Sequence, residues 1–412
     1  MIRSKKLSLA VAAGLSAIIG FGAIANADIS ISSFTPGDLV VLRGGDSVNP
    51  DNTSSNSQVA VYLDEYTTAG SYVGTVDVPS SGGSALTIPS IGDFQHQGVL
   101  SLSTDGNSLS FAGYQVAAGS ADANAAAGAD QPVVGVIGNT ASSLNTSTIV
   151  NSYGPGSSAP FIRGAYTNDG NEFWTFGKFP SSGATSNGGL AYVSGTGPSA
   201  TTTTVEGFAD WRDIIAANGQ LYGGTGSSSV GNHGPYQVSS GEPTTNLGNS
   251  LANNTQLGNY PGGQSASALA LLDLPGDPSS QNGLNVLYTV GDQATPGIVK
   301  YFYNGTTWVN QLDVELNPSN VINPTGLIAA ADPSNPNWVD LTVSGSNGIY
   351  TYVDKSGYNG VIPADAFGLA AAAPSNEAFY GIAIAPNAVP EPASLGLIAF
   401  AGIGLLSRRR LA

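Results

Sequence analysis

Cysteine is absent from all 412 residues. The absence excludes disulfide bonds, thiolate zinc sites and thiol nucleophiles, so any stable domain must rely on its hydrophobic core. Histidine is almost as scarce, since His96 and His233 are the only two. No His-x-x-x-His or His-Glu-x-x-His spacing occurs, so a histidine metal site is not indicated. We interpret His233, which precedes Gly234 and Pro235, as a loop residue.

Positive charge is also scarce, because 12 Lys and Arg residues face 28 Asp and Glu residues. Half of the cations lie near the two ends of the chain, at Arg3, Lys5, Lys6, Arg408, Arg409 and Arg410. The segment between them carries a net charge of about −22. Nucleic acid is excluded as a partner because phosphate contacts need clustered Lys or Arg, and anionic lipid is disfavoured for the same reason. Neutral sugars, cations and proteins remain.

The N-terminus has the pattern of a secretory signal peptide. After its three cations the chain is uncharged from Leu7 to Ile24, and Ala25-Asn26-Ala27 gives the small-x-small site that signal peptidase accepts. We therefore predict a signal peptide over residues 1–27, cleaved so that the mature chain begins at Asp28. The alternative is a retained membrane anchor, which three glycines in the apolar run disfavour.

The C-terminus, residues 388–412, has three parts. Val389-Pro390-Glu391-Pro392 is followed by an apolar stretch over 393–406 and then by Arg408, Arg409 and Arg410. The arginines favour a cytoplasmic end. A helix of this stretch spans only about 21 Å, less than the ~30 Å hydrocarbon core, so it suits a transient rather than a permanent transmembrane anchor.

The stretch VPEPASLGLIAFAGIGLLSRRR resembles the sorting tail of PEP-CTERM proteins in its triplet, its helix and its closing arginines. The resemblance covers about the last two dozen residues. It implies recognition by an exosortase, a Gram-negative host that makes extracellular polysaccharide, and delivery of the protein to the cell surface or medium. The alternative is an ordinary tail anchor with a chance Pro-Glu-Pro.

Residues 28–387 read as one all-β exported domain. Short apolar runs alternate with turns, and a unit of strand, Asp-Gly or Asn-Gly turn and second strand recurs. The units lie at 98–115, 163–177, 211–224, 301–309 and 341–352, and turn glycines stand at 106, 170, 219, 283 and 348. Asn-Gly and Asp-Gly suit hairpin turns because both positions tolerate positive φ.

The spacing of these glycines, 49 to 65 residues, has the size of a propeller blade with long loops. We therefore predict a single β-propeller of six or seven blades, which also resembles the glycine-rich propellers of other PEP-CTERM proteins. The alternative is an array of β-sandwiches, or two sandwiches end to end. We expect 117–131 to form an exposed loop, 370–374 a loop or helical turn, and 379–385 a last strand that pairs with the first blade.

The sequence shows no recognisable catalytic motif. The candidate acid–base pairs are Asp64 with Glu65, Asp169 with Glu172, and Asp313 with Glu315, and surface solvation explains each equally well. Oxygen-rich turns at 103–107 and 167–171 make calcium a minor candidate, although neither completes an EF-hand loop. We expect blade-core packing for the aromatic residues Phe173, Trp174, Trp211, Tyr222, Trp308 and Trp338.

These observations give two functional hypotheses. The first is an exported surface or matrix protein without catalytic activity or cofactor, whose propeller is a scaffold that binds exopolysaccharide or protein. Its partners would be signal peptidase and exosortase during export. The second is a secreted propeller enzyme, a glycosidase or lyase, which needs two or three carboxylates converging on the central channel.

Overall fold

The computed structural model describes residues 29–388 except 52–56, 92–95, 122–129, 154–160, 179–188, 208–209, 227–232, 249–250, 261–264, 276–279, 292–296, 312–320 and 364–366. The signal peptide with Ala25, Ala27 and Asp28, the sorting motif Val389 to Pro392, the 393–406 helix and the closing arginines lie outside this range. No helix in the described part is long and apolar enough to cross a membrane.

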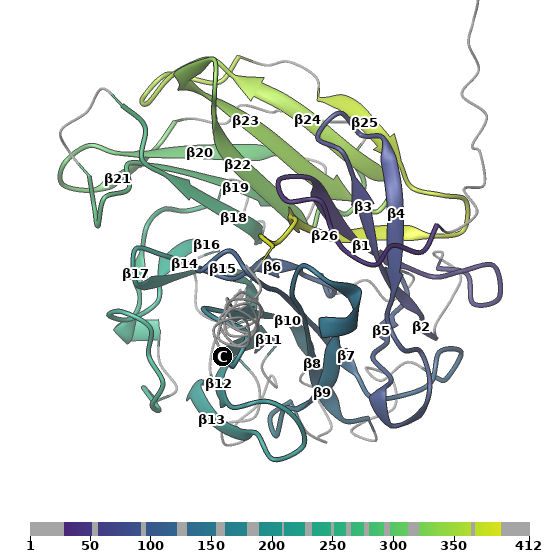
Figure 1. Cartoon of the computed structure of the whole chain (residues 1–412). Helices are drawn as coiled ribbons and strands as arrows, with labels where there is room; N and C mark the ends of the chain where they lie inside the picture. Colours follow the sequence, from purple (N-terminus) through teal and green to yellow (C-terminus); the bar gives the residue numbers. More distant parts are fainter. Residues whose placement is uncertain are drawn as a thin grey trace, which may run out of the picture.

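Six four-stranded antiparallel sheets form the blades of a β-propeller (Figure 1). From the innermost strand outward, they are β26 Ala378–Ile384, β1 Leu39–Gly44, β3 Val61–Tyr66 and β4 Tyr72–Asp77; β6 Ser101–Leu102, β7 Leu109–Tyr114, β8 Pro132–Ile137 and β9 Asn145–Ile149; β10 Ile162–Thr167, β11 Glu172–Gly177, β12 Leu190–Ser194 and β13 Thr201–Glu206; β14 Trp211–Ala217, β15 Gln220–Thr225, β16 Gly234–Gln237 and β17 Thr255–Gln256; β18 Ala266–Leu272, β19 Val286–Gly291, β20 Ile298–Tyr303 and β21 Trp308–Asn310; β22 Gly326–Asp332, β23 Asn335–Gly345, β24 Gly348–Asp354 and β25 Gly368–Ala372. The remaining elements are the β2 Gln58–Val59 and β5 Ile88–Pro89 pair and the short 3₁₀ turns η1 Gly82–Ser84, η3 Ala141–Ser143 and η5 Leu251–Asn253.

The ring is closed by the end of the chain. Strand β26 pairs antiparallel with β1, so that Leu39 lies opposite Ile384, and Figure 1 shows the two side by side. Beyond the strand, the backbone N–H of Ala385 donates to Asp38 O and that of Asn387 donates to Gly106 O, each at 2.8 Å. The predicted single propeller and its closing strand are confirmed, with six blades. Sandwiches are excluded because the six innermost strands surround one axis.

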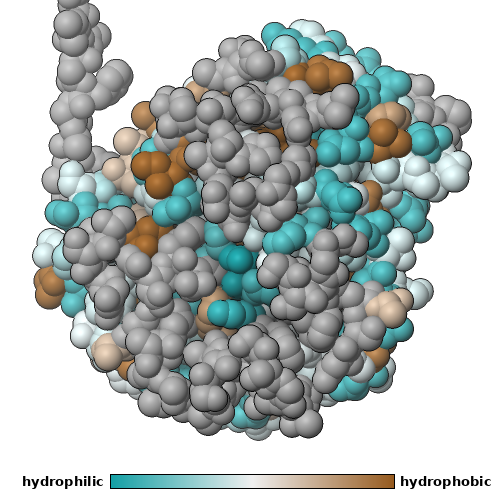
Figure 2. Space-filling model, turned by 180° about the vertical axis from the view of Figure 1, so that it is seen from behind, coloured by the Kyte–Doolittle hydropathy of each residue, from teal (hydrophilic) through white to brown (hydrophobic). Residues whose placement is uncertain are grey.

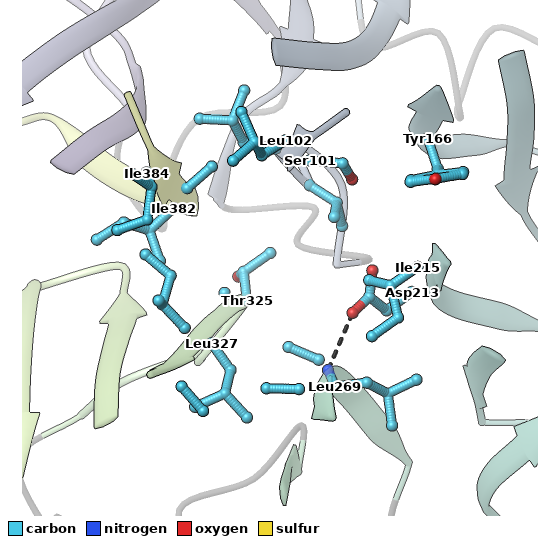
Figure 3. Close-up of a pocket in the computed structure, with 18 of the residues that line it drawn as sticks. Ser101, Leu102, Tyr166, Asp213, Ile215, Leu269, Thr325, Leu327, Ile382 and Ile384 are labelled. Atoms are coloured by element: carbon cyan, nitrogen blue, oxygen red, sulfur yellow. Dashed lines mark hydrogen bonds between the residues drawn. The ribbon is translucent and has the colours of Figure 1, made fainter. Parts of the chain in front are cut away.

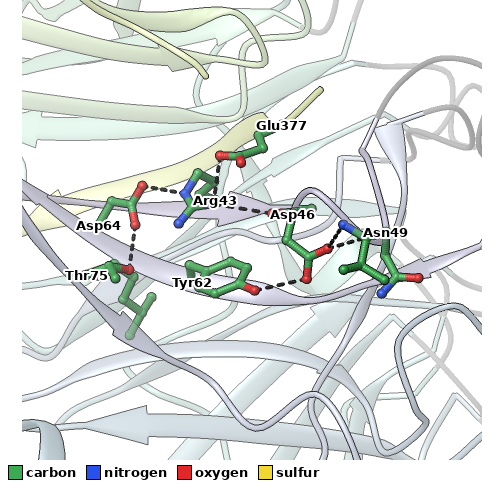
Figure 4. A network of polar contacts seen from close by, with 10 residues as sticks. Arg43, Asp46, Asn49, Tyr62, Asp64, Thr75 and Glu377 are labelled. Atoms are coloured by element: carbon green, nitrogen blue, oxygen red, sulfur yellow. Dashed lines mark hydrogen bonds and ion pairs between the residues drawn. The ribbon is translucent and has the colours of Figure 1, made fainter. Parts of the chain in front are cut away.

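A buried polar network holds this closure (Figure 4). Arg43 of β1 donates from Nε to Asp64 Oδ2 at 2.6 Å and from Nη1 to Glu377 Oε2 at 2.7 Å. Glu377 directly precedes β26, so the arginine ties the first long strand to the last one. Its guanidinium also stacks on Tyr62, 4.2 Å from the ring centroid. The network compensates the burial of Arg43, which is 1% exposed.

The hairpin turns show which parts of the repeat the sequence predicted correctly. At Asn218-Gly219 and Asn282-Gly283 both residues have positive φ, as predicted for such turns. At the turns that contain Gly106, Gly170 and Gly305, only the glycine has a positive φ. The unit at 341–352 was placed wrongly, because Gly345 pairs with Gly348 and the turn is one residue earlier. This turn joins the second and third strands of its blade. The turns that contain the other four glycines used for the spacing join the first and second strands of their blades.

Two predicted loops have different outcomes. The 370–374 segment is not a loop or helical turn: most of it belongs to β25, where Ala371 pairs with Ile349 of β24. Alanine has low strand propensity, and pairing with a long neighbouring strand overrides it. Most of the 117–131 segment lies outside the described residues, while Ala121 makes an isolated bridge with Ser57.

Aromatic side chains fill the spaces between blades, as predicted for four of them. Phe173, Trp174, Trp211 and Tyr222 are at most 2% exposed. Trp308 packs at the edge of a core cluster. The prediction is wrong for Trp338, which is partly exposed and lies under Lys355 Nζ, 4.6 Å from the ring centroid. On the face that Figure 2 shows, the described residues are largely hydrophilic, and their apolar patches are separated from one another.

Candidate binding site at the propeller axis

The innermost strands of all six blades enclose a cavity of about 260 Å³ (Figure 3). Its wall is mostly apolar, with side chains such as Leu102, Ile215, Leu327 and Ile384. The polar side chains among its lining residues are Ser101, Tyr166, Asp213 and Thr325. A largely apolar cavity with a few polar groups is the usual form of a small-ligand site in proteins.

Asp213 of β14 is the acidic residue among the described residues that line this cavity. Its Oδ2 accepts a hydrogen bond from the backbone N–H of Leu269 at 2.9 Å, which links two neighbouring blades. Burial raises the pKa of Asp213 to about 7, and the backbone hydrogen bonds from Leu269 and Ile214 limit the rise. The carboxyl group therefore exchanges its proton near neutral pH.

Three successive blades carry a β-bulge at the same place, near the start of the innermost strand. The bulge residues are Arg163 in β10, Arg212 in β14 and Ser267 in β18, each passed over in the pairing with the second strand. A bulge redirects a side chain out of the regular alternation of a strand. The three side chains therefore occupy equivalent positions at one end of the channel.

Two of these bulge residues share one carboxylate. Arg163 Nη1 is bonded to Asp210 Oδ1, and Arg212 Nη2 lies 3.3 Å from Asp210 Oδ2. Burial alone would raise the pKa of Asp210, but Arg163, Arg212 and Lys178 together hold it below its usual value. Burial, and then the like charge of Arg212, lowers the pKa of Arg163 to about 10. Arg163, Asp210 and Arg212 thus form a compact ionic cluster.

His96 covers the axis at this end. His96 precedes β6, yet its Nδ1 lies 3.5 Å from Ser267 Oγ of β18. The blade of β18 is the third after the blade of β6, so these two blades stand opposite each other in the ring of six. His96 has a positive φ of 59° and is 6% exposed. Burial, followed by the charges of Arg212 and Arg163, lowers the pKa of His96 well below 6.5, so the ring is neutral at pH 7.

The structure thus brings His96 into a site that the sequence did not indicate, and leaves His233 elsewhere. His233 is a partly buried loop residue whose carbonyl accepts from Tyr260 N, in line with its interpretation. The arginines were missed because their roles depend on bulges. Their scarcity was a usable signal, since only six cations lie between the two ends of the sequence.

The candidate carboxylate pairs do not form acid–base sites where they are described. Asp64 is bound to Arg43 and Thr75, while the neighbouring Glu65 accepts from Thr35 N at 2.6 Å. Asp169 and Glu172 are exposed at the β10–β11 hairpin. Asp313 and Glu315 lie outside the described residues.

In the 103–107 turn, one of the two calcium candidates, the Asp105 carboxylate is hydrogen-bonded within the turn itself. Asp105 Oδ1 accepts from Ser103 Oγ at 2.6 Å and from Asn107 N at 3.0 Å, and Oδ2 accepts from Asn107 Nδ2 at 3.0 Å. Within the part of the chain that the structure describes, no group of three or more His, Asp or Glu residues is arranged to hold a metal ion.

The end of the chain is recognised by comparison with known families. The pattern of the PEP-CTERM protein-sorting motif matches residues 388–410. The chain carries a PEP-CTERM sorting motif. A PEP-CTERM motif implies processing by an exosortase, with export and sorting to the cell surface in Gram-negative bacteria. The match begins one residue after Asn387, whose backbone N–H donates to Gly106 O of the propeller.

Several solved structures are similar to this chain at low identity. The GH74 enzyme of Niastella koreensis is 14% identical, with a TM-score of 0.39 over 82% of this chain and 46% of that one. This chain therefore spans less than half of its length. The periplasmic gluconolactonase of Pseudomonas aeruginosa is 9% identical, with a TM-score of 0.37 over 76% of this chain and 78% of that one.

An α-L-arabinofuranosidase from Fusarium graminearum, in complex with an iminosugar inhibitor, is 9% identical. Its TM-score is 0.42, over 76% of this chain and 93% of that one. These similarities show no activity or ligand for this chain. A comparison with curated proteins finds no match to its sequence.

Proposed function

We propose that this protein is released from the inner membrane by an exosortase and acts at the cell surface as a non-catalytic scaffold. In this role the propeller binds extracellular polysaccharide or a surface protein. The proposal combines the sorting motif, the strongly acidic domain, and an axial site that offers ligand-binding groups. Exposed acidic residues keep such a domain soluble outside the cell.

The observation that carries the proposal is the position of the motif relative to the fold. Asn139 Nδ2 donates to Pro386 O at 2.9 Å, and Asn387 N donates to Gly106 O, so the folded domain reaches to the residue before the matched segment. The closing strand β26 ends at Ile384. Cleavage near Glu391 therefore leaves every strand of the propeller in the released product.

The sorting step is tested by replacing Pro390-Glu391-Pro392 with alanines. Prolines keep the segment before the membrane extended and accessible to a protease, whereas alanines favour a helix. We expect full-length variant in the inner membrane, still carrying Arg408 to Arg410, and shortened wild-type protein at the surface. Wild-type protein in a host without exosortase is the control and should behave like the variant. A variant that reached the surface with the wild-type mass would exclude this assignment.

The scaffold role is tested on extracellular polysaccharide from the host. We expect the processed protein to sediment with the polysaccharide and to leave its chain length unchanged during prolonged incubation. Failure to sediment with polysaccharide or with any surface protein of the host would contradict the scaffold role, whatever the outcome of the sorting test.

A second candidate function, an enzyme acting on glycans, is favoured by Asp213. A carboxyl group with a pKa of about 7 in a cavity has the property of a general acid. Glycoside hydrolysis also needs a second carboxyl group across the substrate. Release of reducing ends from polysaccharide by the wild-type protein, lost in Asp213→Asn, would favour this function over the scaffold.

A further inference from the structure

The axial cavity lies between the bulges of the innermost strands and the far ends of those strands. In β14 and β18 its lining begins directly after the bulge residues, at Asp213 and Ala268. In β26 the lining extends to Ile384, the last residue of that strand. Because His96 covers the axis on the bulge side, we take the side where the strands end as the entrance.

Acidic residues surround the axis at this entrance. In five of the six blades an aspartate lies within three residues of the point where the innermost strand ends or its partner begins. These residues are Asp38, Asp105, Asp169, Asp273 and Asp332. Three of the six cations between the chain ends, Arg163, Lys178 and Arg212, lie on the bulge side instead, whereas Lys355 acts on Asp332. Charge of one sign around an opening concentrates ions of the opposite sign, so the entrance favours a cation.

Asp213 places a carboxyl group inside the cavity, and Figure 3 shows it turned toward the space between the labelled side chains. It is 4% exposed, and its hydrogen-bond donors in the described part of the chain are neutral backbone N–H groups. Two other buried aspartates have a cation of the chain: Arg43 Nε lies 2.6 Å from Asp64 Oδ2, and Lys300 Nζ lies 2.9 Å from Asp354 Oδ2. A cation in the cavity can compensate the buried charge of Asp213 in the same way.

The rest of the cavity wall suits an apolar body. The hydroxyl of Tyr166 donates to Asn168 Oδ1 at 2.5 Å and that of Thr325 donates to Asn323 O at 3.2 Å, so both are engaged by the chain. A dry cavity of about 150 Å³ binds benzene. The present cavity of about 260 Å³ therefore accommodates a benzene-sized ring with a short side chain. The many hydroxyls of a sugar would lack partners against this wall.

We infer that the axial cavity binds a small organic amine, whose ammonium group pairs with the Asp213 carboxylate and whose apolar body lies against the aliphatic wall. Arg212, the neighbour of Asp213 in sequence, does not take this place, because its Nη2 lies 3.3 Å from Asp210 Oδ2. The inference goes beyond the proposed scaffold function, since this ligand is neither a polysaccharide nor a protein.

Calorimetric titration of the processed protein with phenethylamine and phenethyl alcohol at pH 8 tests the inference. The two compounds have nearly the same shape and differ in charge. At this pH Asp213, with a pKa of about 7, is mainly ionised, while burial raises the pKa of Tyr166 and keeps it neutral. We expect the amine to bind at least about tenfold more tightly than the alcohol, because only the amine forms a charge-assisted hydrogen bond. The processed protein is used because the sorting tail continues from Asn387, which is bonded to Gly106 at the entrance.

Asp213→Asn removes the charge and keeps the shape of the side chain. This variant should bind the amine at least about tenfold more weakly than the wild type and should no longer prefer it to the alcohol. Asp77→Asn is the matched control, since it makes the same substitution at an exposed position of β4, the outermost strand of its blade. It should bind as the wild type does. Equal affinities of the two variants for the amine would overturn the inference.

Methylamine tests the apolar wall, because it carries an ammonium group without the ring. We expect it to bind the wild type at least about tenfold more weakly than phenethylamine. Equal affinities for the two amines would show attraction to the acidic surface instead of binding in the cavity, and would overturn the inference. Equal affinities for phenethylamine and its alcohol, or no binding of the amine, would overturn it as well. These comparisons need only the wild type, and sedimentation with polysaccharide tests the scaffold role separately.

Discussion

The carboxylate of Asp213 and the backbone N–H of Leu269 form a 2.9 Å hydrogen bond between neighbouring blades. This bond orients the one acidic group among the described residues of the cavity wall toward a backbone donor. Because the donor is neutral, it does not compensate the cost of burying a charge there. The result is a group that keeps its proton to a higher pH in the folded protein than in the unfolded chain.

Stability should therefore fall as pH rises through the range set by Asp213. Its pKa is about 7 when folded and 3.8 as the reference value, so the folded state binds the additional proton between these values. Its favourable contribution is complete below pH 4 and is lost by about pH 7. Asp213→Asn keeps the acceptor and removes the charge. We expect the free energy of unfolding of this variant to exceed that of the wild type by on the order of 2–4 kcal/mol at pH 8 and to match it near pH 4.

Urea unfolding of both proteins at the two pH values measures this difference. Asp51, whose pKa is raised to about 6 chiefly by burial, adds a dependence of the same sign in both proteins. It therefore cancels in the comparison. An equal deficit or gain of the variant at pH 4 and pH 8 would show that the carboxyl group does not titrate in the cavity.

Loss of Arg43 should weaken the closure of the ring. Arg43→Met leaves Asp64 buried without its cation and removes the bond to Glu377, so we expect a loss of about 3–5 kcal/mol in the free energy of unfolding. Lys355→Met, at an exposed position, should change it by less than about 0.5 kcal/mol. Chemical denaturation gives both values. A similar small effect in the two variants would mean that the network in Figure 4 does not hold the closure.

Glycine is required at position 219 by backbone conformation alone. Gly219 has a φ of +74° with no atom within 4 Å of an added Cβ, so Gly219→Ala should cost about 1–2 kcal/mol without any steric clash. Gly83 has equally open surroundings and no positive φ. Gly83→Ala should therefore be neutral or slightly stabilising. Thermal unfolding of the pair compares the two effects, and equal losses would refute the conformational explanation.

Removal of the last strand should prevent formation of the propeller. A chain that ends at Ser375 lacks Glu377 and β26, and it leaves the inner edge of β1 without its partner. Open edges promote association between chains. We expect this chain to aggregate and to lose cooperative unfolding, whereas a chain that ends at Asn387 should fold. Near-ultraviolet circular dichroism and size-exclusion chromatography report the outcome, and a monomeric, cooperative short chain would contradict it.

The sequence allowed prediction of those features that depend on local chemistry. Asn218-Gly219 was readable because its turn requires positive φ at both positions, and the motif around Pro390 was readable because its parts are contiguous. The corresponding turn between β22 and β23 lies near Ser334 and contains no glycine, so the spacing pattern missed it. Local patterns therefore identified the fold and placed one of its repeats incorrectly.

The axial site was not readable for a different reason. Arg163 and Arg212 are 49 positions apart and become equivalent only through the bulges in their strands. His96 meets Ser267 only after the ring has closed. Contacts across the axis join blades that have no local relation in the chain, so neither periodicity nor spacing indicates them.

The pairing of Leu39 with Ile384 sets an order of events during secretion. A chain that crosses the membrane with its N-terminus first presents β1 early, but this strand obtains its partner only when nearly the whole domain has crossed. Folding therefore finishes late, because the decisive contact has a very large separation in sequence. The sorting motif emerges directly behind β26, so the moment at which the ring can close is also the moment at which the processing site arrives.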